Sequence, residues 1–201
     1  IKSMQKDDAG ILITLWPFAD WDQQSSHSGK PLYRPTFPEL GASLYKPCDL
    51  AAYSSWVNAT VERYDGDGID DMPKLLYPVR HWEIANEPEM QEPPVVFFQG
   101  SPADYIEILR ASTQAIRNAD PSAMVILGGQ AGMLDHMIRY WEPILAEATR
   151  EDMFDVGNIH SISSSDTFFS AEYREFLNEH GHAAKPYWIT EAEIDNSPGL
   201  S

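Results

Sequence analysis

The sequence has a single cysteine, Cys48, which excludes a disulfide bond within the chain and a metal site made of several cysteines. It also lacks a His-Glu-x-x-His motif, and it predicts neither a metal ion nor another cofactor. One cysteine does not define the redox compartment, so the composition suits a secreted protein as well as a cytoplasmic one.

Basic residues are scarce as well: 14 Lys and Arg stand against 31 Asp and Glu, which gives a formal net charge of −17. Nucleic acids are bound largely by Lys and Arg that neutralise phosphates, and anionic membrane surfaces also attract basic segments. The charge therefore disfavours both partners and favours a neutral substrate. The sequence also lacks an apolar run of the roughly 18 residues that a membrane span requires.

The chain does contain apolar segments that alternate with amphipathic ones. The apolar segments predict five buried strands, at 11–18, 80–88, 123–129, 154–161 and 186–191. The amphipathic segments predict four helices, at 49–64, 101–118, 133–150 and 170–180. Repeated strand–helix units indicate an α/β protein with a parallel sheet and right-handed crossovers.

Two local features qualify this pattern. The third helix is expected to be interrupted at Pro143, because proline removes a helical hydrogen bond. Residues 19–47 are expected to form a long loop, which is unusual in a compact domain unless it is functional. Its aromatic side chains suit the wall of a site for an extended ligand; they are Trp21, Tyr33, Phe37 and Tyr45.

The absence of a glycine-rich phosphate loop after an early strand argues against a doubly wound nucleotide-binding sheet. The alternative is a (β/α)8 TIM barrel, which usually needs about 250 residues and eight strands. Residues 1–201 are therefore predicted to be one barrel domain that is incomplete at both ends. An arc of five strands leaves open edges, so further chain segments or a partner chain are expected to complete it.

Two of the predicted strands end in a carboxylate. Glu87 lies in the corner Asn86-Glu87-Pro88, and Glu191 ends the last strand. Active sites of α/β proteins lie at the carboxyl ends of the strands, so we expect these two glutamates to be partners. Glu193 is the alternative to Glu191, because it lies two residues further on the same strand face.

Another glutamate, Glu83, shares the strand face of Glu87 but lies four residues earlier, about 13 Å deeper. We expect it to be a buried structural acid with a polar partner.

The corner Asn86-Glu87-Pro88 and the later Glu191 resemble the clan of retaining (β/α)8 glycoside hydrolases, in which an Asn-Glu pair ends strand four and a Glu ends strand seven. Two predicted strands lie between them here, so the chain would cover strands three to seven. The resemblance is greatest to β-xylosidases, iduronidases and endoglucanase-type enzymes. Two residues depart from that pattern: Ala85 stands where many members have Trp or Gly, and Ile162 stands where many have Tyr. These departures leave the substrate open.

The resemblance implies a retaining glycosidase that cleaves a neutral, β-linked glycan, with Glu87 as general acid/base and Glu191 as nucleophile. It implies that Asn86 binds the sugar 2-hydroxyl and that His160 contacts the sugar or the nucleophile; a core histidine is the alternative for His160. Trp16 ends the strand-three equivalent and is expected to stack on a sugar, with core packing as an equally good interpretation.

Two other functions remain open: a carbohydrate-binding barrel without catalytic activity, and a metal-dependent barrel hydrolase. The loop Asp65–Asp71 resembles a calcium loop but lacks the closing Glu. It precedes the strand that carries Glu87, so we expect a solvated turn on the face of the barrel opposite to the catalytic one.

Overall fold

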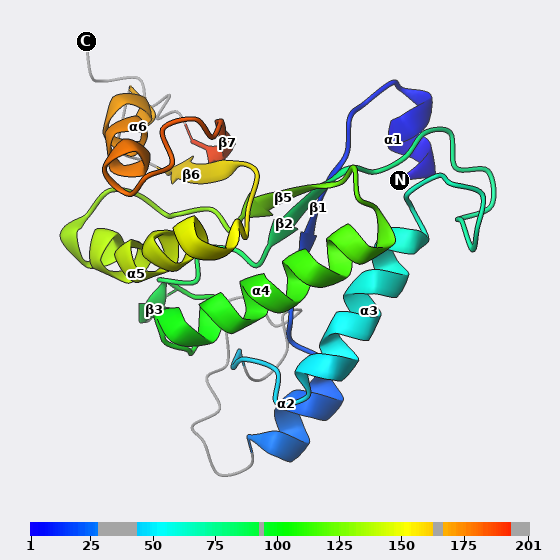
Figure 1. The fold of residues 1–201 in the computed structure, drawn as a ribbon, viewed down its shortest axis with the longest axis horizontal. Coiled ribbons are helices and arrows are strands. Elements are labelled where there is room, and N and C mark those ends of the chain that lie inside the picture. Colours follow the sequence, from blue (N-terminus) through cyan, green and yellow to red (C-terminus); the bar gives the residue numbers. More distant parts are fainter. Residues whose placement is uncertain (28–43, 93–94, 163–166, 194–201) are drawn as a thin grey trace.

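A computed structural model of the protein describes residues 1–27, 44–92, 95–162 and 167–193, and it contains all five predicted strands (Figure 1). They are β1 (Leu12–Leu15), β2 (His81–Ile84), β5 (Met124–Leu127), β6 (Gly157–Ser161) and β7 (Tyr187–Ala192).

The strands are parallel, and they follow one another in space in the order of the sequence. β1, β2 and β5 form one sheet, and β6 pairs with β7. Two parallel bridges, Ile126 to Val156 and Gln130 to Ile159, continue the arrangement from β5 to β6. The predicted parallel α/β architecture is therefore confirmed. Over the described residues the strands do not close into a barrel.

The four predicted helices are present as α3 (Leu50–Glu62), α4 (Pro102–Ala119), α5 (Asp135–Glu151) and α6 (Ser170–Glu179). A short helix, α1 (Lys2–Lys6), precedes the first strand. Among the described residues, no helix combines the length and the apolar composition that a membrane span requires.

The prediction of a loop over 19–47 is wrong at its start, because α2 (Asp20–Ser26) lies there. Two acidic residues in its first turn, Asp20 and Asp22, favour a helix N-terminus through the helix dipole. The helix has only seven residues, too short for a clear apolar period. The remainder of the predicted loop from 28 to 43, with Tyr33 and Phe37, lies outside the described residues.

The predicted interruption at Pro143 is also wrong, because α5 continues through this residue. Pro143 is exposed, so the carbonyl group that loses its helical hydrogen bond can be hydrated.

A small antiparallel hairpin was not predicted. It consists of β3 (Gln91–Glu92) and β4 (Val95–Val96), between the predicted strand over 80–88 and the predicted helix over 101–118.

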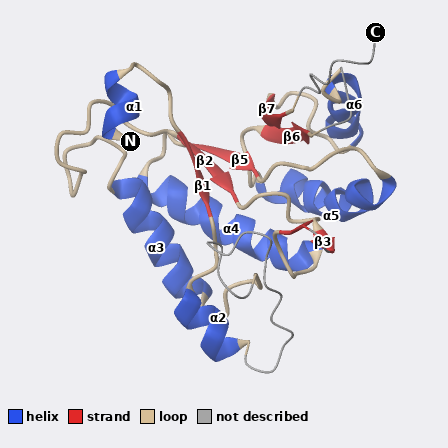
Figure 2. Ribbon diagram, turned by 180° about the vertical axis from the view of Figure 1, so that it is seen from behind, coloured by secondary structure: helices blue, strands red, loops and turns tan. Residues whose placement is uncertain are grey.

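Helices α3, α4 and α5 lie side by side over one face of the strands, and α4 crosses behind β1, β2 and β5 in the reverse view (Figure 2). Trp82 and Ile84 of β2 are fully buried in the core shared with these helices. The residue between them, Glu83, points to the opposite face, because side chains alternate along a strand. The sheet therefore has a hydrophobic face toward the helices and a polar face, on which the candidate site lies.

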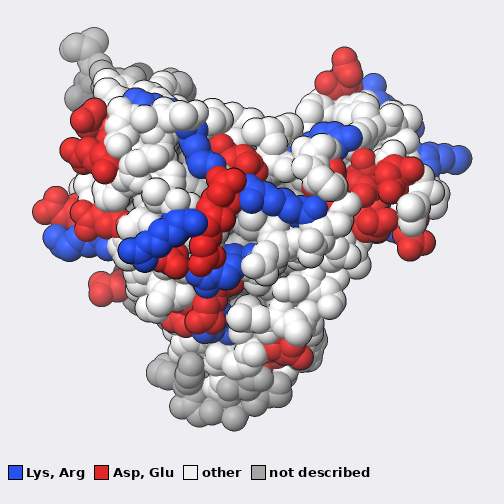
Figure 3. Space-filling view, viewed as in Figure 1, with Lys and Arg blue, Asp and Glu red and all other residues white. Residues whose placement is uncertain are grey.

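Ion pairs join the outer surfaces of α4 and α5. Arg110 pairs with Glu147 and Glu151, and Arg117 pairs with Asp155 that follows α5. In Figure 3 the basic side chains on this face lie among acidic ones. Exposed pairs of this kind contribute only about 0–1 kcal/mol each, so the buried apolar contacts between the two helices dominate their association.

The N-terminus of α4 offers a test of the local structure. Ser101 and Asp104 form a capping box, with Ser101 Oγ accepting from the Asp104 amide and the carboxylate accepting from the Ser101 amide. We expect Ser101→Ala to lower the free energy of unfolding by about 1 kcal/mol. Urea denaturation measures this change. Ser55→Ala, on the exposed face of α3, is the matched control and should stay within about 0.5 kcal/mol of the parent protein.

Candidate active site

The chain turns sharply where β2 ends. Ala85 and Glu87 both have left-handed backbone conformations, with φ of 62° and 38°. Backbone bonds fix the turn, since the Ala85 amide donates to Leu15 O at 3.0 Å and the Glu87 amide donates to Gly129 O at 3.1 Å. Non-glycine residues in this region cost on the order of 1–3 kcal/mol each. The predicted strand over 80–88 therefore ends earlier than expected, at Ile84, and the sequence did not indicate this conformation.

The turn brings Glu87 next to His160 of β6 and Glu191 of β7. Glu87 Oε1 lies 2.7 Å from His160 Nδ1, and Glu191 Oε2 lies 3.8 Å from the same nitrogen. One carboxylate oxygen of Glu87 and one of Glu191 lie within 4.8 Å of each other. Glu87 and His160 are buried, whereas the Glu191 side chain is 52% exposed. The structure thus brings together three of the five site residues that the sequence predicted.

Neighbouring residues hold the His160 ring in place. Its second nitrogen, Nε2, lies 3.0 Å from Thr190 Oγ1, so both ring nitrogens have a partner. Gly129 lies directly against the ring, and a Cβ atom at this position would collide with it. The small residue at 129 is therefore required for the close approach of β6 to the segment after β5.

A buried polar network lies beneath these residues, with Glu83 at its centre. Thr14 of β1 donates to Glu83 Oε2 at 2.6 Å, and Asn158 Nδ2 of β6 donates to Glu83 Oε1 at 2.5 Å. Thr190 of β7 lies 3.0 Å from Asn158 Oδ1 and 3.4 Å from Glu83 Oε1. Glu83 is 3% exposed and hydrogen-bonded, as expected for a structural acid at this depth.

Burial and charge act in opposite directions on His160. Burial alone would lower the pKa of the imidazole, but the hydrogen bond to Glu87 and the nearby charges of Glu191 and Glu83 raise it above its ordinary value. Burial also raises the pKa of the Glu83 carboxyl, although its hydrogen bond from Thr14 opposes this. A charged His160 can therefore stabilise negative charge on both Glu87 and Glu191.

The other two predicted residues take different positions. Asn86 is buried next to Glu87 in the turn. Trp16 instead lines a cavity of about 350 Å³ together with Trp21 and Trp56, and its ring centroid lies 6.0 Å from that of Phe97. Trp16 thus belongs to an aromatic wall beyond the end of β1, and no hydrogen bond joins it to Glu87, His160 or Glu191 in the described part of the chain.

Sequence reasoning missed Glu89, which is 6% exposed and accepts a hydrogen bond from the Ala131 amide at 2.6 Å. Burial raises the pKa of this carboxyl to about 7. It also missed Thr14, Asn158 and Thr190. Their common signal is a polar residue inside an apolar strand segment, which indicates a polar partner on a neighbouring strand.

Comparison with known proteins finds similarity in structure only. No family model matches the sequence, and no curated protein matches it. A glucosidase from Croceicoccus marinus has a similar structure, with a TM-score of 0.70 and 17% identity over 100% of this chain and 38% of that chain. A GH family 44 endoglucanase from Clostridium thermocellum has a TM-score of 0.55 and 14% identity over 96% of this chain and 52% of that chain.

These similarities show that the chain has the fold found in part of two glycoside-cleaving enzymes. The chain spans 38% and 52% of the length of these two proteins. At such low identity the similarity concerns the fold alone, so the assignment of activity depends on the residues at the site.

The pKa of His160 gives a first test of this geometry. We expect Glu87→Gln to lower it, because the amide keeps the shape of the side chain but removes a negative charge. Titration of the imidazole resonances by NMR measures the shift, and a His160→Gln variant assigns them. The resonances of the exposed His136 are the internal control and should be the same in the parent protein and in Glu87→Gln. An unchanged pKa of His160 would contradict the 2.7 Å contact between its Nδ1 atom and Glu87 Oε1.

The sign of the His160 effect on stability follows from its raised pKa. The contribution of the charged imidazole to folding is present below the ordinary histidine pKa and is lost as the pH rises through the raised folded-state value.

Glu89 gives a second test, on a buried acid instead of a buried base. Its carboxyl stays protonated in the folded protein up to a pKa of about 7, while the unfolded chain releases the proton near 4.5. Between these values the folded state binds more protons, so stability falls as the pH rises, by at most about 1.4 kcal/mol per pH unit. We expect Glu89→Gln to reduce this slope, measured by denaturation from pH 4.5 to 7. The exposed Glu92→Gln variant should leave it unchanged.

Proposed function

We propose that this protein is part of a retaining glycoside hydrolase that cleaves O-glycosidic bonds in a neutral, β-linked glycan. The observation that carries the proposal is the approach of one Glu87 oxygen and one Glu191 oxygen to within 4.8 Å. Retaining enzymes place their two carboxyl groups roughly 5–5.5 Å apart, whereas inverting enzymes leave about 6.5–9.5 Å for a water molecule.

Glu191 is the nucleophile in this proposal. Its exposed carboxylate attacks the anomeric carbon, and the bond to the leaving oxygen breaks as a glycosyl ester forms. Glu87 is the general acid that gives a proton to that oxygen, and His160 Nδ1, 2.7 Å from Glu87 Oε1, can supply this proton to Glu87. In the second step Glu87 takes a proton from water, whose oxygen attacks the anomeric carbon and releases Glu191.

His160 is a positioning residue between the two carboxyl groups. Its Nδ1 atom holds Glu87 Oε1 at 2.7 Å and faces Glu191 Oε2 at 3.8 Å. Contact with Thr190 on the other side of the ring fixes its orientation. Asn86 lies beside Glu87 and binds the sugar 2-hydroxyl, an interaction that strengthens in the transition state. Trp16 and its aromatic wall bind a more distant part of the glycan.

We further propose that the five parallel strands are strands three to seven of a (β/α)8 barrel. Their order in space, from β1 to β7 through β2, β5 and β6, supports this assignment. The glucosidase and endoglucanase that resemble the chain are both longer than it, which fits a barrel completed by further chain segments or by a partner chain.

The same three side chains favour one other function. Glu87, His160 and Glu191 are close enough together to hold a metal ion, which a metal-dependent hydrolase would use. Hydrolysis measured in the presence of a metal chelator distinguishes the two functions, because the mechanism with Glu87 as acid and Glu191 as nucleophile requires no metal.

The nucleophile assignment has a direct test with aryl β-glycosides. We expect Glu191→Ala to lower the hydrolysis rate by at least about a thousandfold, because the covalent step is lost. Azide should restore turnover and give a glycosyl azide of inverted configuration. Glu193→Ala is the matched control: it removes an exposed carboxylate two residues away and should keep the parent rate.

Three outcomes would contradict the proposal. Loss of activity in Glu193→Ala but not in Glu191→Ala would identify Glu193 as the nucleophile. Activity that disappears with a chelator and returns with a divalent cation would identify a metal-dependent hydrolase. A parent protein that binds glycans but hydrolyses none of them would be a carbohydrate-binding barrel without catalytic activity.

A further inference from the structure

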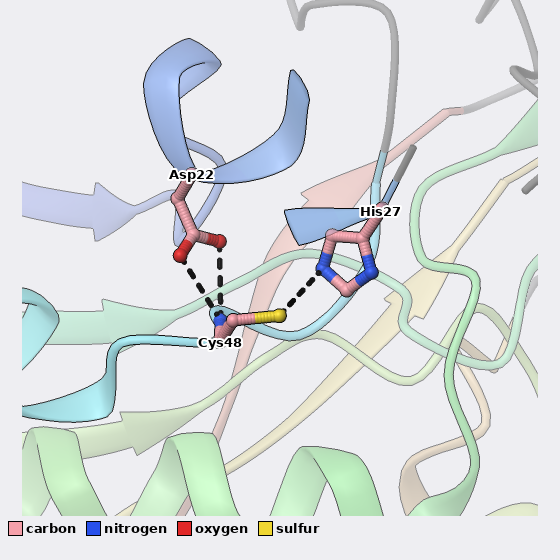
Figure 4. Close-up of side chains that lie close together, drawn as sticks. All are labelled: Asp22, His27 and Cys48. Carbon is pink, nitrogen blue, oxygen red and sulfur yellow. Dashed lines mark hydrogen bonds between the residues drawn. The ribbon is translucent and has the colours of Figure 1, made fainter. Parts of the chain in front are cut away.

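Three side chains with different metal-binding groups lie close together beside α2. None of them belongs to the cluster of Glu87, His160 and Glu191, which we call the Glu87 group. Asp22 lies in α2, His27 ends it, and Cys48 lies just before α3 (Figure 4). The carboxylate oxygen, the imidazole nitrogen and the sulfur lie within 4.8 Å of one another. We propose that these residues bind a divalent cation of the Zn²⁺ type.

The separation between two of the ligand atoms agrees with a shared metal ion. Cys48 Sγ lies 3.4 Å from His27 Nε2. Two ligands at about 2.3 Å (sulfur) and 2.0–2.1 Å (nitrogen) from a tetrahedral Zn²⁺ are about 3.6 Å apart. A cation can therefore bind with only a small adjustment of these two side chains.

The carboxylate of Asp22 is already oriented. Its two oxygens each lie 3.1 Å from the Cys48 amide (Figure 4). Oδ1 also accepts from the Asp49 amide at 3.1 Å. Hydrogen bonds of this kind fix carboxylates that bind metals. These donors are neutral amides and carry no positive charge, whereas a cation would compensate the negative charge of this buried group.

The two chain segments are also fixed relative to each other. Gln23, next to Asp22, donates to Tyr45 O at 2.8 Å and accepts from the Tyr45 amide at 2.9 Å. The Tyr45 ring lies against the His27 ring, with 4.9 Å between their centroids. The ligands are thus held together without a metal, which lowers the entropic cost of binding one.

His27 is 7% exposed, and its Nδ1 atom has no hydrogen-bond partner among the residues that the structure describes. Its Nε2 atom, 3.1 Å from Lys46 O, is the nitrogen that faces the thiol. With a metal on Nε2, the imidazole proton resides on Nδ1, and the Cys48 thiol loses its proton to solvent.

The ligand types select the metal. A thiolate with an imidazole and a carboxylate suits Zn²⁺ or Co²⁺, whereas Ca²⁺ and Mg²⁺ prefer oxygen ligands. Cys48 is exposed, so the fourth position is open to water. Asp22 also lines the aromatic cavity of Trp16, and the metal would therefore stiffen one wall of that cavity.

Cobalt gives the sharpest test, because Cys48 is the only thiol in the sequence. Titration of the reduced 201-residue chain with Co²⁺ should produce a thiolate-to-cobalt charge-transfer band that saturates at one ion per monomer. Zn²⁺ should displace the cobalt and slow the reaction of Cys48 with a thiol reagent. Both effects should weaken as the pH falls, because protons then compete with the metal ion for the ligand atoms.

Variants identify the ligands. Cys48→Ser should abolish the band and His27→Gln should weaken Zn²⁺ binding by at least about a hundredfold, beyond the 10–100-fold typical of outer-shell changes. His136→Gln, which removes an exposed histidine elsewhere, is the control and should bind as the parent does. Asp22 also orders the chain at Cys48, so circular dichroism must show that Asp22→Asn is folded before its affinity is compared.

Several results would overturn the proposal. The first is a Co²⁺ titration without a charge-transfer band. The second is metal binding that survives both Cys48→Ser and His27→Gln. The third is binding of one ion per two chains, and only when the protein is a dimer. Binding that is lost in His160→Gln instead would assign the ion to the Glu87 group, and this result is independent of the Glu191→Ala rescue by azide.

Discussion

The buried carboxylate of Glu83 is the interaction on which the arrangement of the strands depends. It is 3% exposed and receives hydrogen bonds from Thr14 of β1 and Asn158 of β6, while Thr190 of β7 completes the group. An unpaired carboxyl at this depth would be strongly destabilising, so these strands must all be in register to satisfy it. The same network carries Thr190, which in turn orients His160 beside Glu87 and Glu191.

Much of the fold could be predicted because its signals are local. Apolar runs located all five parallel strands, and amphipathic segments located α3, α4, α5 and α6. The helix α2 could not be found in this way, since it is short and its stability depends on contacts such as Gln23 with Tyr45. Pro143 was misleading because the cost of a proline depends on whether water can reach the freed carbonyl group.

The candidate site was predictable only in part for a related reason. The strand ends indicated Glu87 and Glu191, but the left-handed turn that directs Glu87 depends on backbone bonds to β1 and to the segment after β5. The burial of Glu89, which raises its pKa to about 7, is likewise a property of the packed structure. The group of Asp22, His27 and Cys48 has no recognised spacing, because its members come from two segments that a long connection separates.

The Glu83 network has a consequence for the order in which the protein folds. The five parallel strands lie in space in the order of the sequence, so each strand–helix unit can pack onto the previous one as soon as it is made. Glu83 differs, since its partners lie 69, 75 and 107 residues away along the chain. Its last contact must wait for β7, and until then the carboxyl remains hydrated or protonated. The polar face of the sheet is thus assembled last, after the hydrophobic side is in place.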